Sequence, residues 1–392
     1  MLIKSIKAKK FKINDKISLH IILKTSHGKF KSKLSLNSNS FYSKEQLQND
    51  VDFVNKILKE KIKNLEINSF DDIKKLENLI KQQDKKILRK SLFVIEQSIL
   101  KALSKDEFWK FINPAIKTIP RPLGIIFGRS DIKQSCDFKQ ILIFSLENNN
   151  FNKAIEANSR VHELLEREIK KYDKDFKGEI NLQGALVANI SNFDILDIIS
   201  RVCKQVSDEF KFNLNIGINF DSDSIHNDDH YHYKNFSGSE KEKSLNKKEQ
   251  IAYIINLVKR YNLFYIEDPL EKDNFNGYKQ LKKKVNCLII GNKLINSKIE
   301  NLNLAIKDNC INAFVLKLND IGSLMEAKSL IDLANKNNIR LIAETSDHET
   351  DENFLVHFAI AFNIPVIKYG IYKKDKEKID LINKIQSIMK NK

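Results

Sequence analysis

Four short apolar segments in the second half of the chain each run directly into a charged residue. They are 264–266 before Glu267, 313–316 before Lys317, 341–343 before Glu344 and 365–367 before Lys368. The stretches between them have the periodicity of amphipathic helices, and this alternation is the pattern of a parallel β/α barrel. Barrels of this kind carry their chemistry at the C-terminal ends of the strands. We therefore expect two carboxylates and two lysines to face one pocket.

The first third of the chain has a different pattern. Residues 2–36 read as strands with a turn at 26–29, and residues 44–109 have helical periodicity. Strands followed by helices are typical of an α+β domain. The expected fold class is therefore α/β, with an N-terminal α+β domain over residues 1–115 and a C-terminal TIM-like β/α barrel over residues 120–392.

The start of the barrel is less regular than its end. The predicted elements, in chain order, are strands 123–127 and 140–144, helices 152–171 and 192–209, and strand 214–219. A polar loop is expected over residues 221–244. Asn246 and Glu249 then form a capping-box-like start to the next helix.

The chain of 392 residues is strongly basic, with 67 Lys and Arg against 51 Asp and Glu and a formal net charge of +16. Such a charge attracts polyanions without regard to sequence. The lysines are scattered, however, and form no arginine-rich or aromatic-interleaved block. We therefore expect nucleic-acid binding to be nonspecific only.

The cysteines are few and widely spaced, at Cys136, Cys203, Cys287 and Cys310. This spacing matches neither a disulfide framework nor a zinc motif and indicates a reducing compartment. The first residues contain no apolar signal region, and no apolar run approaches membrane-spanning length. The expectation is a cytoplasmic protein with no membrane partner.

Several motifs at the predicted strand ends resemble the enolase family. Residues 316–323 read Leu-Lys-Leu-Asn-Asp-Ile-Gly-Ser, close to the family's Leu-Lys-x-Asn-Gln-Ile-Gly-Ser/Thr. Ile-Glu-Asp-Pro at 266–269 and Ile-Lys-Tyr-Gly at 367–370 stand at the expected distances, and Glu-Thr-Asp-Glu at 349–352 is similar to the family's Glu-Thr-Glu-Asp. The resemblance covers the whole chain, more loosely in its first third. It implies the two-domain fold of phosphopyruvate hydratase, the glycolytic, Mg²⁺-dependent lyase that converts 2-phosphoglycerate to phosphoenolpyruvate.

The resemblance assigns roles to three retained residues. Lys317 matches the general base that removes the proton beside the substrate carboxylate. Lys368 matches the lysine that helps to hold this carboxylate, and Glu267 matches one of three acidic Mg²⁺ ligands. In the family a metal site stabilises the doubly charged enediolate.

Most other positions of the family's site are replaced. The two further metal-ligand positions read Asn219 and Asn292 in place of Asp, and Lys293 adds a cation beside them. The acidic positions that assist departure of the hydroxyl read Gln140 and Gln183, neutral amides that do not exchange protons. Because Mg²⁺ prefers carboxylate oxygen, we expect it to be absent or weakly bound.

The family's phosphate contacts are replaced as well. Where the family has Ser-His-Arg-Ser, residues 344–347 read Glu-Thr-Ser-Asp, and no arginine follows Arg340. The family's Gly-Gly-x-His reads Gly-Arg-Ser-Asp at 128–131, and its mobile serine-rich loop is only faintly present at 37–40. Without a guanidinium group, phosphate binding there is disfavoured.

Some readings of individual residues stay open. Lys317 and Lys368 either keep catalytic roles or pair with Glu267 or Glu344, and loss of the metal favours the ion pairs. Asp221 takes over as a metal ligand if a bulge intervenes. The segment 221–232 is rich in Asp and His and could bind a transition metal, although such loops are more often solvated.

Three functions follow from the sequence. The leading one is an enolase-fold protein that has lost the reaction and serves as a binding or scaffolding protein, as a homodimer or as a heterodimer with a true enolase. The second is an active enolase, or a related lyase on a carboxylate substrate, with Lys317 as the general base. The third is a basic RNA-associated protein, which only the net charge supports.

Overall fold

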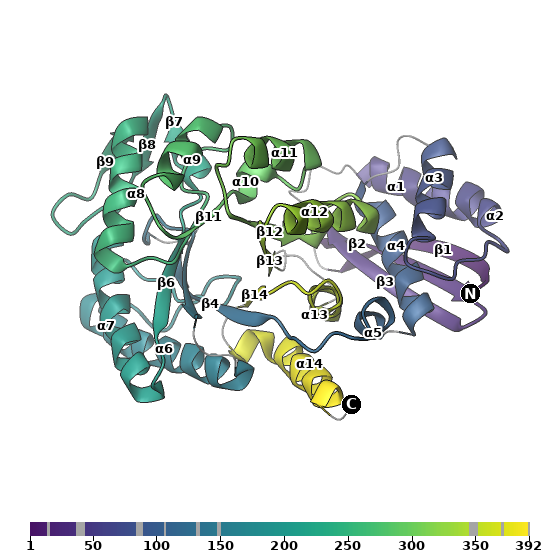
Figure 1. Ribbon diagram of the computed structural model, residues 1–392, viewed down its shortest axis with the longest axis horizontal. Helices are drawn as coiled ribbons and strands as arrows, with labels where there is room; N and C mark the ends of the chain where they lie inside the picture. Colours follow the sequence, from purple (N-terminus) through teal and green to yellow (C-terminus); the bar gives the residue numbers. More distant parts are fainter. Residues whose placement is uncertain are drawn as a thin grey trace.

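A computed structural model of the chain shows two parts side by side (Figure 1). The residues that it describes are 1–13, 16–36, 44–83, 89–105, 107–130, 134–146, 150–344, 352–369 and 372–390. Within these ranges, no helix combines the length and the apolar character that a membrane span requires.

An antiparallel sheet opens the chain, as predicted. Its strands, in spatial order, are β1 (Ile3–Ile13), β2 (Lys16–Thr25) and β3 (Gly28–Leu36). The alternate residues Leu19, Ile21 and Leu23 of β2 are buried, which is the period-two pattern of a sheet with one covered face.

Helices cover this face of the sheet. They are α1 (Lys44–Phe53), the π-helical turn η1 (Val54–Leu58), α2 (Lys59–Lys61), α3 (Ile73–Gln83), α4 (Arg89–Ser104) and α5 (Phe108–Ile112). The long helix α4 lies against β2 and β3. The N-terminal part is therefore an α+β unit, as its sequence pattern predicted.

Eight strands then close into a barrel. In chain order they are β4 (Arg121–Gly128), β5 (Gln140–Ser145), β6 (Leu214–Asn219), β10 (Tyr265–Glu267), β11 (Leu288–Ile290), β12 (Ala313–Lys317), β13 (Arg340–Glu344) and β14 (Val366–Tyr369). The barrel is confirmed, but the expectation that all its strands are parallel is wrong, since β5 runs antiparallel to both β4 and β6. Parallel neighbours need a long crossover, usually a helix, and only residues 129–139 join β4 to β5.

Helices surround the barrel. They are α6 (Phe151–Tyr172), α7 (Asn192–Phe210), α8 (Lys247–Tyr261), α9 (Phe275–Lys282), α10 (Asn292–Ile295), α11 (Ile299–Lys307), α12 (Leu324–Lys336), α13 (Glu352–Ala361) and α14 (Tyr372–Lys390), with short 3₁₀ turns η2 (Ser222–Ser224) and η3 (Leu318–Asp320). The predicted capping box is confirmed: the Asn246 side chain accepts from the Glu249 backbone N–H at 3.1 Å, and the Glu249 side chain accepts from the Asn246 N–H at 2.8 Å.

The segment predicted as a polar loop over 221–244 is instead largely structured. It forms η2 and a small antiparallel sheet of β7 (His226–Asn227), β8 (His230–Tyr233) and β9 (Lys243–Asn246). Tyr231 and Tyr233 are buried, whereas His230 and His232 are exposed. The alternation His-Tyr-His-Tyr at 230–233 is the pattern of a half-buried strand. The many Asp and His residues of this segment instead suggested a solvated loop.

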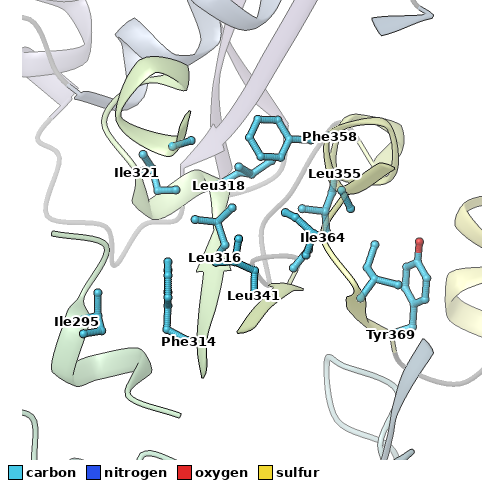
Figure 2. Close-up of a cluster of buried hydrophobic side chains, with 14 of the residues drawn as sticks. Ile295, Phe314, Leu316, Leu318, Ile321, Leu341, Leu355, Phe358, Ile364 and Tyr369 are labelled. Carbon is cyan, nitrogen blue, oxygen red and sulfur yellow. The ribbon is translucent and has the colours of Figure 1, made fainter. Parts of the chain in front are cut away.

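Apolar side chains fill both faces of the barrel strands. Ala313 and Val315 of β12 belong to a cluster on one face, and Leu316 belongs to the larger cluster on the other. Figure 2 shows Leu316 among the side chains that lie between β12 and α13, where Leu355 and Phe358 are labelled. This alternation leaves the polar residues that end the strands in the barrel mouth.

The N-terminal part packs against the barrel on the side of α12 and α13 (Figure 1). The ring of Phe108 in α5 lies 4.7 Å, centroid to centroid, from that of Phe354 in α13. Deeper in this contact, Glu96 of α4 accepts a hydrogen bond at 2.6 Å from the backbone N–H of Leu324, the first residue of α12. Helix α4 thus caps the beginning of a barrel helix.

Candidate functional site

The polar ends of the barrel strands meet at one level. Neighbouring strands pair Gln140 with Asn219, Asn219 with Glu267, Lys317 with Glu344, and Glu344 with Lys368. Because β5 runs against its neighbours, its first residue reaches the end of the barrel at which the parallel strands finish. The barrel mouth is therefore lined by side chains from the C-terminal ends of the parallel strands and from the N-terminal end of β5.

Gln183 reaches the same place from a turn between α6 and α7. The backbone of Leu186 bonds to Ile126 O at 3.0 Å and to Gly128 N at 3.1 Å, so this segment runs along the end of β4. Gly184 has a φ of 78°, a left-handed conformation that suits glycine and closes the turn. The turn places the Gln183 side chain against the barrel mouth.

Lys368 lies at the centre of an ionic network. Its Nζ is 2.6 Å from Glu267 Oε2 and 3.3 Å from Glu344 Oε1, and its side chain is 0% exposed. Lys317 Nζ lies 3.4 Å from Glu344 Oε2, and the Tyr265 hydroxyl donates to Glu267 Oε2. One fully buried and one partly buried ammonium group therefore balance two buried carboxylates, as buried charges require.

These groups fix one another's charge. Burial alone would raise the pKa of Glu344, but the ammonium groups of Lys317 and Lys368 outweigh it and lower the pKa to about 2. Burial would lower the pKa of Lys317, yet the carboxylates of Glu344 and Glu267 raise it above its ordinary value. Lys317 is thus protonated near neutral pH, whereas a general base needs a free electron pair.

Four amides extend the network. Asn219 Nδ2 donates to Gln140 Oε1 at 3.1 Å, and Gln140 Nε2 donates to Gln183 Oε1 at 2.7 Å. Gln140 Nε2 also lies 3.4 Å from Glu344 Oε1. On the other side, Asn292 Nδ2 donates to Glu267 Oε1 at 3.1 Å. The structure therefore joins all seven predicted site residues, through Glu344, in one connected network.

Asp221 lies beside this network in a cluster of cations. Its Oδ1 is 2.6 Å from Lys293 Nζ, and its Oδ2 is 2.7 Å from Arg129 Nη2 and 4.0 Å from Lys139 Nζ. Burial would raise the pKa of Asp221, but these three cations lower it. The carboxylate therefore acts as their counter-ion, which argues against the open reading of Asp221 as a metal ligand.

A buried acid completes the barrel mouth. Asp268 follows Glu267 in a left-handed conformation, with a φ of 45°, and its Oδ1 accepts from the Lys293 backbone N–H at 2.9 Å. Burial, followed by repulsion from Glu267, raises the pKa of Asp268 to about 7. A negative charge on Asp268 is thus poorly tolerated in this buried position next to Glu267.

The residues present do not fit Mg²⁺, which needs six oxygen ligands in near-octahedral geometry. Both oxygens of Glu267 are engaged, one by Asn292 and the other by Lys368 and Tyr265. The Asn219 amide uses its nitrogen on Gln140 and its oxygen on the Asp221 backbone N–H, at 3.1 Å. Within the described ranges, no three His, Cys, Asp or Glu side chains are arranged to hold a metal. A metal would have to displace a buried ammonium and two amides.

Part of the sequence pattern lies outside the described residues. This applies to the serine-rich segment 37–40, to Asp131, to 345–351, which covers most of two motifs, and to Gly370. Arg129, from the same motif as Asp131, is described and bonds to Asp221 as given above.

Most Asp and His residues of 221–232 find hydrogen-bond or ion-pair partners within the protein, whereas the buried Nε2 of His226 has no hydrogen-bond partner among the described residues. His232 Nδ1 lies 2.8 Å from Ser244 Oγ, and its Nε2 lies 3.2 Å from Asn227 O. Asp229 pairs with Lys247 at 3.0 Å. These side chains are arranged as hydrogen-bond and ion-pair partners of the small sheet.

Sequence reasoning missed two contributors to the site. Tyr265 stands two residues before Glu267, and the period-two alternation of a strand was the signal that both face the barrel mouth. Lys139 directly precedes β5, but its direction toward the mouth depends on the antiparallel course of this strand, which the sequence did not reveal.

The fold and these strand-end residues define a class: proteins with an α+β N-terminal part and a β/α barrel that carries lysines and carboxylates at one end. The family model "Enolase, C-terminal TIM barrel domain" matches residues 116–391. The chain belongs to the enolase family.

Curated relatives agree with this assignment. A protein named Enolase from Methanosphaera stadtmanae is 29% identical over 314 residues, 76% of this chain and 75% of the relative. Enolases from Archaeoglobus fulgidus and Natronomonas pharaonis are 28% and 30% identical, over 70% and 65% of this chain and 67% and 62% of theirs. At these identities, residues of the site can differ between this chain and its relatives.

Proposed function

We propose that this enolase-family protein does not dehydrate 2-phosphoglycerate and acts as a non-catalytic binding or scaffolding protein. One observation supports the proposal above all others: the residues at the former catalytic positions satisfy one another. Lys368 is fully buried between Glu267 and Glu344, and the amide positions are hydrogen-bonded in a chain. A site that awaits a charged substrate and a metal leaves such groups available.

The chemistry of the individual residues supports the same conclusion. Removal of a proton beside a carboxylate needs a base and a cation that stabilises the enediolate. Lys317 has a raised pKa, and Gln140 and Gln183 do not transfer protons. Each lost transition-state contact costs about 2 to 4 kcal/mol, so the losses together remove most of the rate enhancement.

A steady-state assay tests the proposal directly. Formation of phosphoenolpyruvate from 2-phosphoglycerate is followed by ultraviolet absorbance at millimolar Mg²⁺, with the Archaeoglobus fulgidus enolase as the positive control. We expect no turnover above the protein-free blank. Turnover within about a hundredfold of the control would contradict the proposal, because losses of about 2 to 4 kcal/mol per contact exceed that factor when combined.

The alternative is an active lyase with Lys317 as the base. It predicts that any turnover of 2-phosphoglycerate, or of another carboxylate, disappears in Lys317→Ala and survives in a control such as Lys328→Ala. Lys328 is a partly exposed residue of α12 that pairs with Asp332, four residues further along the same helix. Loss of turnover in Lys317→Ala alone would favour the alternative over the scaffold.

Scaffolding requires a partner, and the family resemblance makes a second enolase-type chain the first candidate. We propose a homodimer or a heterodimer with a true enolase. Light scattering after size exclusion, on the protein alone and after mixing with an enolase from the same cells, gives the masses. A monomeric mass in both samples would reject both dimers.

A further inference from the structure

A cleft lies at the end of the barrel opposite the candidate site. Its volume is about 910 Å³, and the residues that form it surround the N-terminal ends of β13, β14 and β4. Arg340, the first residue of β13, lies in this cleft, and Glu344 of the candidate site is four residues further along the same strand. At the rise of a β-strand this is about 13 Å, so the cleft is separate from the site described above.

Three cations line the cleft: Lys117, Arg121 and Arg340. The lining residues include no carboxylate among those that the structure describes, and none of the three cations forms an ion pair with a described residue. Lys328, by comparison, has a carboxylate partner in Asp332. Like charges gathered without a counter-ion repel one another and attract an anion.

Arg121 is held in place by the protein. Its Nη1 donates to the backbone oxygen of Leu146 at 2.9 Å, and its guanidinium carbon lies 5.3 Å from the centre of the Phe144 ring. The same residue is fixed through its backbone, whose N–H donates to Pro365 O at 2.9 Å. A positioned guanidinium is a better partner for a phosphate or carboxylate than a freely moving one, because less freedom is lost on binding.

The floor of the cleft is apolar. It is formed by Ile119, Ile339, Leu341, Ile364 and Pro365. Ile339, Leu341 and Ile364 are buried in the core cluster, and Figure 2 shows the side chains of Leu341 and Ile364 near one another. The exposed lining of the cleft as a whole is more polar than apolar, and its volume falls within the range of roughly 300 to 1,000 Å³ that small-molecule sites have.

We propose that this cleft binds a phosphorylated small molecule with an apolar or aromatic part, the chemical class of the nucleoside polyphosphates. The phosphates lie on Lys117, Arg121 and Arg340, and the apolar part lies on the floor. Asn335 and Asn338, which also line the cleft, offer amide groups for hydrogen bonds at its rim. The proposal is independent of whether the opposite end of the barrel catalyses a reaction.

Isothermal titration calorimetry with ATP, pyrophosphate and adenosine, all without Mg²⁺, tests the proposal. We expect ATP to bind more tightly than pyrophosphate, which lacks the apolar part, and more tightly than adenosine, which lacks the charge. Arg340→Gln and Lys117→Gln should each weaken ATP binding about tenfold, the factor that one charge-assisted hydrogen bond represents. Both side chains are exposed, so the variants should keep the wild-type melting temperature.

A matched control is Lys204→Gln, since Lys204 is an exposed lysine of α7 outside the cleft and should leave ATP binding unchanged. Three results would overturn the proposal: no binding of ATP at millimolar concentration, equal weakening in Lys204→Gln and Arg340→Gln, or ATP binding that neither cleft variant weakens. Binding of single-stranded RNA that Arg340→Gln abolishes, without binding of ATP, would also overturn it and assign the surface to nucleic acid.

Discussion

Replacement of Lys368 by methionine should destabilise the protein strongly. At an effective dielectric constant of about 20, the Nζ–oxygen distances of 2.6 Å to Glu267 and 3.3 Å to Glu344 correspond to attractions of about 6 and 5 kcal/mol. The desolvation cost of the buried ammonium, several kcal/mol, offsets part of this attraction. Two facing carboxylates would remain in a buried site, and we expect a loss of about 3 to 5 kcal/mol in the free energy of unfolding.

Urea unfolding at pH 7, followed by far-ultraviolet circular dichroism, measures this loss. The control Lys328→Met removes a partly exposed cation of α12 and should change the free energy of unfolding by less than about 1 kcal/mol. Adding Glu267→Gln to Lys368→Met should recover part of the loss, because Glu267 is the carboxylate left without an ammonium partner, whereas Glu344 keeps Lys317. If Lys368→Met were as stable as the wild type, or more stable, the network would not be structural. Such a result is typical of residues that are kept for catalysis at the expense of stability.

Three further predictions concern other parts of the molecule. Burial raises the pKa of Glu96 well above its ordinary value, so the folded state holds this proton more tightly than the unfolded chain does. This contribution to stability is complete below the ordinary glutamate pKa and is lost as pH rises from there through the raised pKa of the folded state. Glu96→Gln, which keeps an acceptor for the Leu324 N–H, should therefore melt higher than wild type at pH 7 and gain little at pH 4. Asn246→Ala removes the cap of α8 and should cost about 1 kcal/mol in urea unfolding, whereas Asn246→Asp should be nearly neutral. Nucleic-acid binding, measured by fluorescence anisotropy, should weaken steeply with salt and show no sequence preference, and tight binding of one RNA motif at physiological salt would contradict this.

The sequence predicted most of the fold because its patterns are local. The apolar segments that end in Glu267, Lys317, Glu344 and Lys368 predicted where these strands lie in the chain. The register of the barrel strands then brings their ends to one level. The antiparallel course of β5 was not predictable in this way, since a buried strand reads the same in either direction.

The composition of the site was predictable, but its bonding was not. The replacements at Asn219, Asn292, Gln140 and Gln183 are visible in the sequence, whereas their hydrogen-bond partners depend on distances across the barrel. The cleft at Arg340 had no sequence signal, because its cations come from segments far apart in the chain.

The central claim is that, where the family has a metal site, this protein has a network of side chains whose charges and hydrogen-bonding groups pair with one another. Calorimetric titration of Mg²⁺ into the wild-type protein tests it most directly, with the variant Asn219→Asp, Asn292→Asp, Lys293→Asp as the comparison. We predict no saturable heat from the wild type and no change in melting temperature beyond that from equal ionic strength of sodium chloride. The variant should melt lower without metal, because its new carboxylates crowd around Glu267 and Asp221. Mg²⁺ at a hundred times its dissociation constant should return about 2.7 kcal/mol of stability. Saturable Mg²⁺ binding by the wild type, with a gain of several degrees that sodium does not reproduce, would contradict the claim.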